Sequence, residues 1–159
     1  MRTFAAFVAF FLSVGIATAQ DGAEARSKGL IGLSAKACAD KLGTPIAVNR
    51  SRQANIMGLF NVDTDPSMTF RTQGGNGLTV QCFFPTAQPT SKCHAVIYRG
   101  MQGDGELLGR LLASESQGSR WFESTMEESE HLGTVIKWQR EDGGSADYTG
   151  GVGLTIRGK

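Results

Sequence analysis

Three cysteines and two histidines are the side chains of this 159-residue chain most able to act as nucleophiles, bases or metal ligands. Cys38, Cys82 and Cys93 do not follow the paired spacing of a structural zinc site, and no base is recognisable beside any of them. His94 and His131 fall in different predicted elements, so nothing in the spacing brings them together. We therefore expect no catalytic thiol, no metal site and no cofactor.

A run of glutamates offers the other candidate chemistry, an acid and base pair. Glu127 and Glu130 are three residues apart and would be neighbours on one face of a helix, with Glu128 beside them. Such a run is typical of a solvated helix face. The chain also lacks a G-x-S-x-G nucleophile elbow and a phosphate-binding loop with its lysine. The sequence predicts that the protein is not an enzyme.

The first residues, 1–19, have the form of a cleavable export signal. Arg2 provides the positive start, a short apolar run follows, and small residues end at Ala19. We expect cleavage between Ala19 and Gln20, followed by a flexible arm over residues 20–29. Because Gln20 and not a cysteine follows the cleavage site, we expect no lipid anchor. The sequence therefore predicts a periplasmic or secreted protein.

Charge and length limit what the exported chain can be. The net charge of +1 equals the contribution of Arg2, so the chain without its signal is neutral. A neutral chain without a basic cluster disfavours nucleic acid and an anionic membrane surface as partners. No second apolar stretch reaches the roughly 20 residues of a membrane span. About 140 residues is the size of one domain, which we place at residues 30–159.

A short helix and a meander of three antiparallel strands are expected in residues 30–100. Ser34 is a suitable N-cap for a helix over residues 35–42, and Gly43 supplies its C-cap. Alternating apolar residues then predict three strands, separated by a glycine-rich turn and a proline-containing loop. These strands are residues 68–72, 78–84 and 93–99.

The meander places two of the cysteines on neighbouring strands. If the loop closes symmetrically, Cys82 and Cys93 lie opposite or nearly opposite each other on one face, close enough for a disulfide. In an oxidising compartment this bridge is the preferred interpretation, and it leaves one free thiol. A bridge from Cys38 on the helix to one of the two strands is the alternative.

The second half, residues 101–159, is expected to contain a helical segment and two strands. Four leucines at helical spacing predict a helix over residues 105–114. Apolar residues among the glutamates, from Trp121 onward, favour a second helix with an acidic face, and a strand starting at Arg120 is the alternative. Residues 135–140 and 152–156 are predicted strands. Trp121 and Trp138 are the large aromatics available to anchor a core or a partner.

The expected fold class is therefore α+β, with a short N-terminal helix packed on an antiparallel β-meander and a further helix and strands in the C-terminal half. The segments Leu30-Ile31-Gly32-Leu33-Ser34 and Leu42-Gly43-Thr44-Pro45, followed by the three strands, resemble the BamE-like (SmpA/OmlA) domain. The resemblance covers about residues 30–100. It implies a bacterial envelope protein that helps assemble outer-membrane machinery, with no catalytic residues to carry over. The chain departs from the family in lacking a lipobox cysteine.

Three functions are compatible with these features. The preferred one is an exported, non-enzymatic protein-binding module, a periplasmic accessory to envelope or secretion-system assembly. The first alternative is a secreted inhibitor or effector that acts on an extracellular target. The second is a small hydrolase, which would need a pocket that gathers His94 or His131 with two carboxylates.

Overall fold

The computed structural model describes the backbone of most of the chain from Gly29 onward. The described residues are 29–50, 53–56, 60–63, 65–72, 77–101, 104–130 and 133–159. The expected export signal, its cleavage site at Ala19 and Gln20, and all but the last residue of the expected arm lie outside the described residues, as does His131.

Strands dominate the described part of the chain, which contains two short helices and ten strands. The helices are α2 (Ala35–Leu42) and α3 (Gly105–Ser114). The strands are β1 (Ala47–Asn49), β2 (Gln53–Ile56), β3 (Phe60–Asp63), β4 (Ser67–Arg71), β5 (Thr79–Phe83), β6 (Ala95–Arg99), β7 (Trp121–Ser129), β8 (Gly133–Arg140), β9 (Ser145–Thr149) and β10 (Gly153–Arg157). Neither helix is long and apolar enough to cross a membrane.

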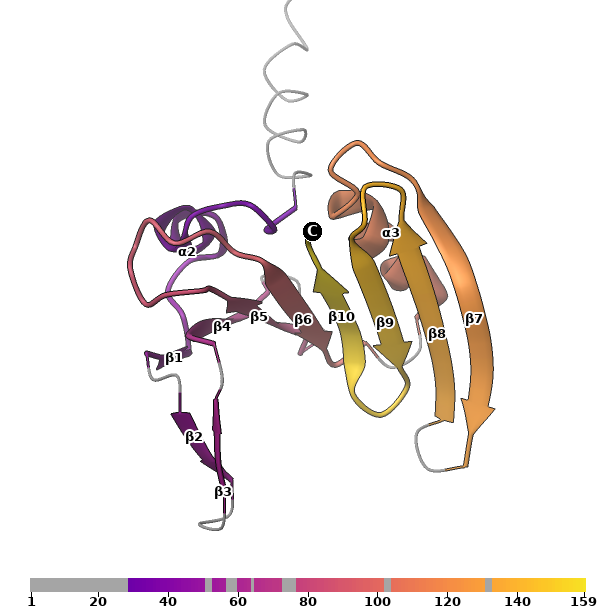
Figure 1. Cartoon of the computed structure of the whole chain (residues 1–159), viewed down its shortest axis with the longest axis horizontal. Helices are drawn as coiled ribbons and strands as arrows, with labels where there is room; N and C mark the ends of the chain where they lie inside the picture. The colour runs from indigo at the N-terminus through magenta and orange to yellow at the C-terminus, as the bar shows by residue number, and fades with distance from the viewer. Residues whose placement is uncertain are drawn as a thin grey trace, which may run out of the picture.

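Eight strands form one antiparallel sheet in the order β1-β4-β5-β6-β10-β9-β8-β7, and β2 with β3 forms a separate hairpin (Figure 1). The last strand of the chain, β10, lies in the middle of this order. It pairs with β6 on one side and with β9 on the other, with Ile156 opposite Val96 and Ala146. The final strand therefore joins the two halves of the sequence into one sheet.

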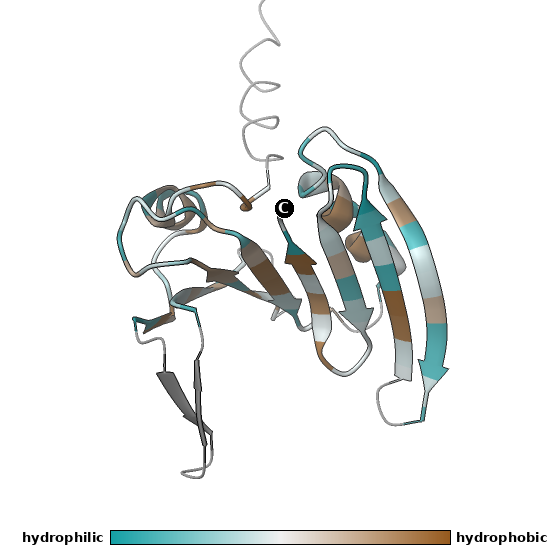
Figure 2. Cartoon of the chain, in the orientation of Figure 1, coloured by the Kyte–Doolittle hydropathy of each residue, from teal (hydrophilic) through white to brown (hydrophobic). Residues whose placement is uncertain are grey.

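One face of the sheet forms the core, and both helices pack against it. The alternating residues Val80 and Cys82 of β5 are buried, and the same alternation continues in β6, β10 and β9. Figure 2 shows the hydrophobic residues gathered on the central strands and on α3 where it faces the sheet. Buried residues from both helices, among them Cys38 and Leu112, belong to this one cluster.

Both helices begin at a side chain that accepts backbone hydrogen bonds. Ser34 Oγ accepts from the N–H of Ala37 at 3.1 Å, and Asp104 Oδ1 accepts from the first turn of α3 at 3.0 Å. Gly43 ends α2 with a φ of 92°, a conformation that glycine adopts without strain. The predicted helices over 35–42 and 105–114 and the predicted three-stranded meander are confirmed.

The expected acidic helix after Trp121 is wrong, because this segment is strand β7. Its pairing with β8 contains a bulge between Glu123 and Thr125, which shifts the alternation by one residue. Trp121 and Met126 therefore pair with residues of one sheet face, Arg140 and Ile136, although they are an odd number of positions apart. That shift hides the strand period in the sequence.

The expected fold class is therefore wrong as well. The expected fold is a helix packed on a meander, with a further helix and strands in the C-terminal half, whereas one eight-stranded antiparallel sheet with two short helices dominates the described residues. The second half contains four strands and not the expected two, because β7 takes the place of the expected helix and no sequence signal predicts β9. The predicted strands over 135–140 and 152–156 correspond to β8 and β10.

Candidate functional site

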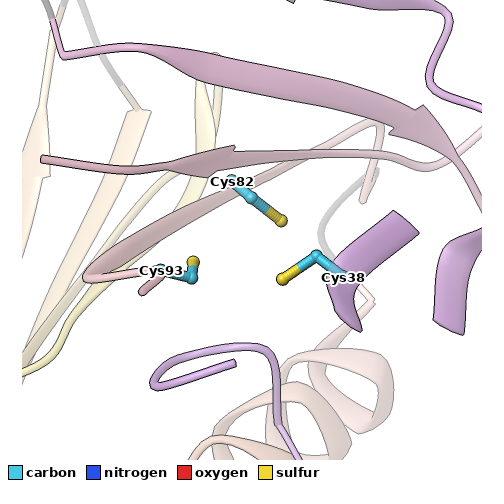
Figure 3. A group of neighbouring side chains, drawn as sticks. All are labelled: Cys38, Cys82 and Cys93. Carbon is cyan, nitrogen blue, oxygen red and sulfur yellow. The ribbon is translucent and has the colours of Figure 1, made fainter. Parts of the chain in front are cut away.

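The three cysteines converge in the core between α2 and the first half of the sheet. Cys38 comes from α2, Cys82 from β5 and Cys93 from the segment just before β6, and their Sγ atoms all lie within 4.8 Å of one another. Figure 3 shows the three sulfur atoms pointing into the same space. Cys38 and Cys82 are completely buried, and Cys93 is 2% exposed. We call these three residues the cysteine triangle.

Local structure explains why each sulfur points inward. Cys38 lies one turn after Ala35, the other buried residue of α2, so both face the sheet. Cys82 follows the alternation of β5. The backbone of Cys93 is paired with the segment that leads into α2, since its N–H donates to Leu33 O at 2.8 Å and its carbonyl accepts from Gly32 N at 2.7 Å. Helix α2, strand β5 and the hydrogen-bonded segment before β6 therefore each direct one sulfur into the triangle.

No disulfide is present, and all three cysteines are free. The expected symmetric closure of the loop between β5 and β6 is wrong, because the register places Cys82 opposite Val96 and Cys93 falls before the start of β6. Cys82 and Cys93 are therefore not a cross-strand pair. Their sulfurs are close because both side chains point into the same space. The Sγ atom of Cys38 points there too, and all three Sγ atoms lie within 4.8 Å of one another.

The close contacts inside the triangle shift the pKa values of the three thiols in different directions. Donation from Cys82 and then from Cys93, with the charge of Lys41 as a smaller cause, lowers the pKa of Cys38 well below its usual range. The same contacts with Cys38, with burial, raise the pKa of Cys82 and Cys93. The Ala95 carbonyl, 3.3 Å from Cys93 Sγ, is a second acceptor for that thiol.

The two tryptophans contact the rest of the fold. Trp138 of β8 is buried, and Trp121 at the start of β7 is half-buried. Trp121 Nε1 donates to Leu112 O at 2.8 Å, and the guanidinium carbon of Arg140 lies 5.2 Å from the centre of its ring. Trp121 therefore connects α3 to the sheet, and Trp138 belongs to the buried core.

The remaining candidate residues are not brought into one site. His94 Nε2 lies 3.0 Å from an Asp65 carboxylate oxygen, and its Nδ1 is buried without a hydrogen-bond partner among the described residues. Glu127 and Glu128 are exposed on β7, and Glu130 is exposed just after it. A hydrolase site would need a histidine with two carboxylates, and the described residues place one carboxylate, that of Asp65, beside His94. The glutamates lie on or just after the edge strand β7.

A buried polar network under α3 was missed entirely. The carboxylate of Glu115 is fully buried and accepts from Leu30 N at 2.7 Å, Ile31 N at 3.1 Å and Tyr98 Oη at 3.0 Å. Burial, with the neighbouring carboxylate, raises the pKa of Tyr98 well above its usual range. Glu115 stands in a polar stretch of the sequence, so no local signal marks it as buried.

Arg140 completes this network from β8. Its buried side chain donates to Glu115 O at 2.6 Å, to Asp142 Oδ1 at 2.6 Å and to Gln117 Oε1 at 3.2 Å. We call Glu115 and Arg140 with these partners the polar clamp. It fixes the end of α3 to β6, to β8 and to the start of the described chain.

An apolar groove of about 390 Å³ opens at the β1 end of the sheet. It lies between α2, β1, β4 and the loop after β5, and its walls are mostly apolar. Its lining residues include Ala39, Pro45, Val48, Met68, Phe84 and Pro89. Two large apolar side chains here are exposed, Ile46 at 57% and Val48 at 50%. No local sequence pattern marks this groove, because its walls come from four separate segments.

Comparison with known protein families, with curated proteins and with solved structures finds no match to this chain. The function is therefore argued from the residues of the chain itself.

Proposed function

We propose that the protein is an exported, non-enzymatic binding module that receives an extended segment of a partner protein along β1, as a periplasmic accessory to envelope or secretion-system assembly. The observation that carries this proposal is the apolar groove beside a sheet edge. Export itself is supported by the signal-like residues 1–19, and the envelope role by the resemblance of residues 30–100 to the BamE-like domain.

Strand β1 ends the eight-stranded order, so among the described strands only β4 pairs with it in this sheet. An added strand can hydrogen-bond to such an edge and place alternate side chains in neighbouring pockets. Val48 pairs with Met68 of β4, and both residues line the groove. An extended segment bound at β1 would therefore direct every second side chain toward this apolar wall.

The charges at the groove define the rest of the partner segment. Lys36 and Arg50 line it. Lys36 is paired with Asp40 at 2.7 Å, whereas Arg50 is exposed and forms no ion pair with any residue that the structure describes. We therefore propose a segment with alternating apolar side chains and at least one carboxylate placed to meet Arg50.

The opposite edge of the sheet is poorly suited to strand addition. β7 carries Glu123, Glu127 and Glu128, which are exposed, and a bulge interrupts its ladder. Charged side chains and bulges are the features by which natural sheets protect an edge from pairing. This difference between the two edges supports β1 as the proposed docking edge.

A peptide selection tests this proposal directly. The chain from Gln20 onward is immobilised, and a displayed library of short random peptides is selected against it. We expect enrichment of alternating apolar sequences that contain Asp or Glu. Val48→Asp should weaken binding of the enriched peptides at least about tenfold, equivalent to about 1.4 kcal/mol. Phe122→Asp, which changes an exposed apolar residue of β7, is the matched control and should bind normally.

Equal binding by the Val48→Asp protein, or enriched peptides without apolar alternation, would exclude β1 as the docking edge. A photo-crosslinking amino acid in place of Val48 in the producing cells then identifies the compartment of the partner. Crosslinks to envelope assembly proteins support the accessory role. Crosslinks confined to an extracellular target favour the secreted inhibitor instead.

A further inference from the structure

We propose that the cysteine triangle is a three-coordinate site for a soft monovalent metal ion, Cu(I), bound by Cys38, Cys82 and Cys93 together. This site is separate from the docking edge, since the residues that line the groove include none of the three cysteines.

The spacing of the sulfurs suits one shared ion. A metal with sulfur bonds of about 2.3 Å in a trigonal plane needs sulfurs about 4.0 Å apart. The three Sγ atoms already lie within 4.8 Å of one another, and they come from three different elements. A disulfide would use two of the sulfurs and leave the third beside it, whereas one metal ion uses all three.

The ligand set selects the metal. Thiolates favour soft ions, and Zn²⁺ in structural sites almost always takes four ligands. Among the described residues, the group contains three sulfurs and neither a histidine nor a carboxylate close enough to be the fourth ligand. Cu(I) accepts three sulfur ligands without a fourth. The described donors therefore fit Cu(I) better than Zn²⁺.

The burial of the three cysteines also favours the reduced ion, Cu(I), over Cu(II). The sulfurs are 0 to 2% exposed, so a bound ion would be shielded from water and from oxidants. Binding involves no electron transfer, because each thiol that becomes a ligand releases its proton to solvent while the copper stays Cu(I).

A competition titration tests the site. The chain from Gln20 onward, reduced and kept free of oxygen, is titrated with Cu(I) against the chelator bathocuproine disulfonate. We expect one Cu(I) per chain and an X-ray absorption spectrum with three sulfur neighbours at about 2.3 Å. The melting temperature should rise with Cu(I). Failure to take Cu(I) from the chelator, or a spectrum with two sulfur neighbours, would overturn the proposal.

Variants show whether the triangle is the site. Cys38→Ala, Cys82→Ala and Cys93→Ala should each weaken Cu(I) binding at least about a hundredfold, since even outer contacts of metal ligands contribute tenfold to a hundredfold. Met101→Leu removes another buried sulfur and should bind as the unchanged chain does. If an alanine variant does not fold, the stoichiometry and the spectrum of the unchanged chain decide. Unchanged affinity in a folded alanine variant would contradict the site.

Two further outcomes count against Cu(I). If Zn²⁺ binds more tightly than Cu(I) and the Co²⁺-substituted protein gives a four-coordinate spectrum, the triangle is a zinc site and not a Cu(I) site. Thiol counting on protein taken from its own compartment, denatured without reductant, should find three thiols once copper is removed by the chelator. A single thiol would mean that the cysteines form the disulfide predicted from the sequence and not a metal site.

Discussion

The two helices cover the same face of the sheet, but different chemistry holds each of them. Beneath α2 lie the three sulfurs of the cysteine triangle, whose state depends on oxidation and metal. Beneath α3 lies the polar clamp, in which Glu115 and Arg140 are buried and hydrogen-bonded. One half of the fold therefore has a hydrogen-bonded anchor, whereas the anchor of the other half is the proposed Cu(I) site, which the metal would strengthen.

The largest effect is expected at the centre of the polar clamp. Glu115→Ala leaves two backbone N–H groups and the Tyr98 hydroxyl without an acceptor in the core. At about 1 to 3 kcal/mol for each unsatisfied group, the free energy of unfolding should fall by roughly 3 kcal/mol or more. Urea denaturation measures this loss. The control is Glu106→Ala, which breaks an exposed pair with Arg110 and should cost under about 1 kcal/mol.

Arg140 tests the same anchor from the sheet side. Arg140→Ala removes donors to Glu115 O and Gln117 and the partner of the partly exposed Asp142. We expect a loss of roughly 2 kcal/mol in urea denaturation. Arg157→Ala, which breaks a more exposed pair with Asp147, should cost much less. Equal losses for the two arginines would show that burial adds nothing at the clamp.

Hydrogen exchange compares the two helices directly. α2 has eight residues and α3 has ten, and the polar clamp holds the end of α3 through Glu115, so in the reduced, metal-free protein the amides of α2 should exchange at least about tenfold faster than those of α3. Cu(I) should slow exchange in α2 and leave α3 unchanged. Equal protection of the amides of α2 and α3 without metal would contradict the proposed difference in how the two helices are anchored.

The helix caps provide a smaller, matched test. Ser34→Ala and Asp104→Ala each remove a side chain that accepts from the first turn, and each should cost about 1 kcal/mol in thermal or urea unfolding. Asp104 accepts two hydrogen bonds and carries a charge that suits a helix N-terminus, so its loss should be the larger. A larger loss at Ser34 would mean that α2, not α3, is the more tightly coupled helix.

The smallest expected effect is a change in the stability of the fold at acid pH. Hydrogen bonds from Arg140, and then from Gly144 N, lower the pKa of Asp142 below its usual 3.8. Its carboxylate therefore stabilises the fold above the unfolded pKa, and this contribution disappears as the pH falls from about 3.8 through the lower folded value. Asp142→Asn should lose part of the stability at neutral pH and flatten the acid end of the profile. Parallel profiles for the two proteins would contradict the assignment.

Local signals account for the elements that the sequence predicted correctly. Ser34 and Gly43 mark the ends of α2, and the alternation in residues 78–84 marks β5, because caps and strand periods act within a few residues. The bulge in β7 disrupts that period, so the glutamates beside it indicated a helix that does not form. The register between β5 and β6 also depends on how the loop closes, which explains why Cys82 lies opposite Val96 and not opposite Cys93.

The sequence alone determined the two described helices, the meander and the residue types available for chemistry. Only the tertiary structure decided that β10 would join β6 to β9, that Glu115 would be buried, and that the three cysteines would meet. The reason is that caps and periods are local, whereas the contact of Cys38 with Cys82 and Cys93 depends on how α2 packs on the sheet. Packing joins residues distant in sequence, and no spacing rule along one chain encodes that.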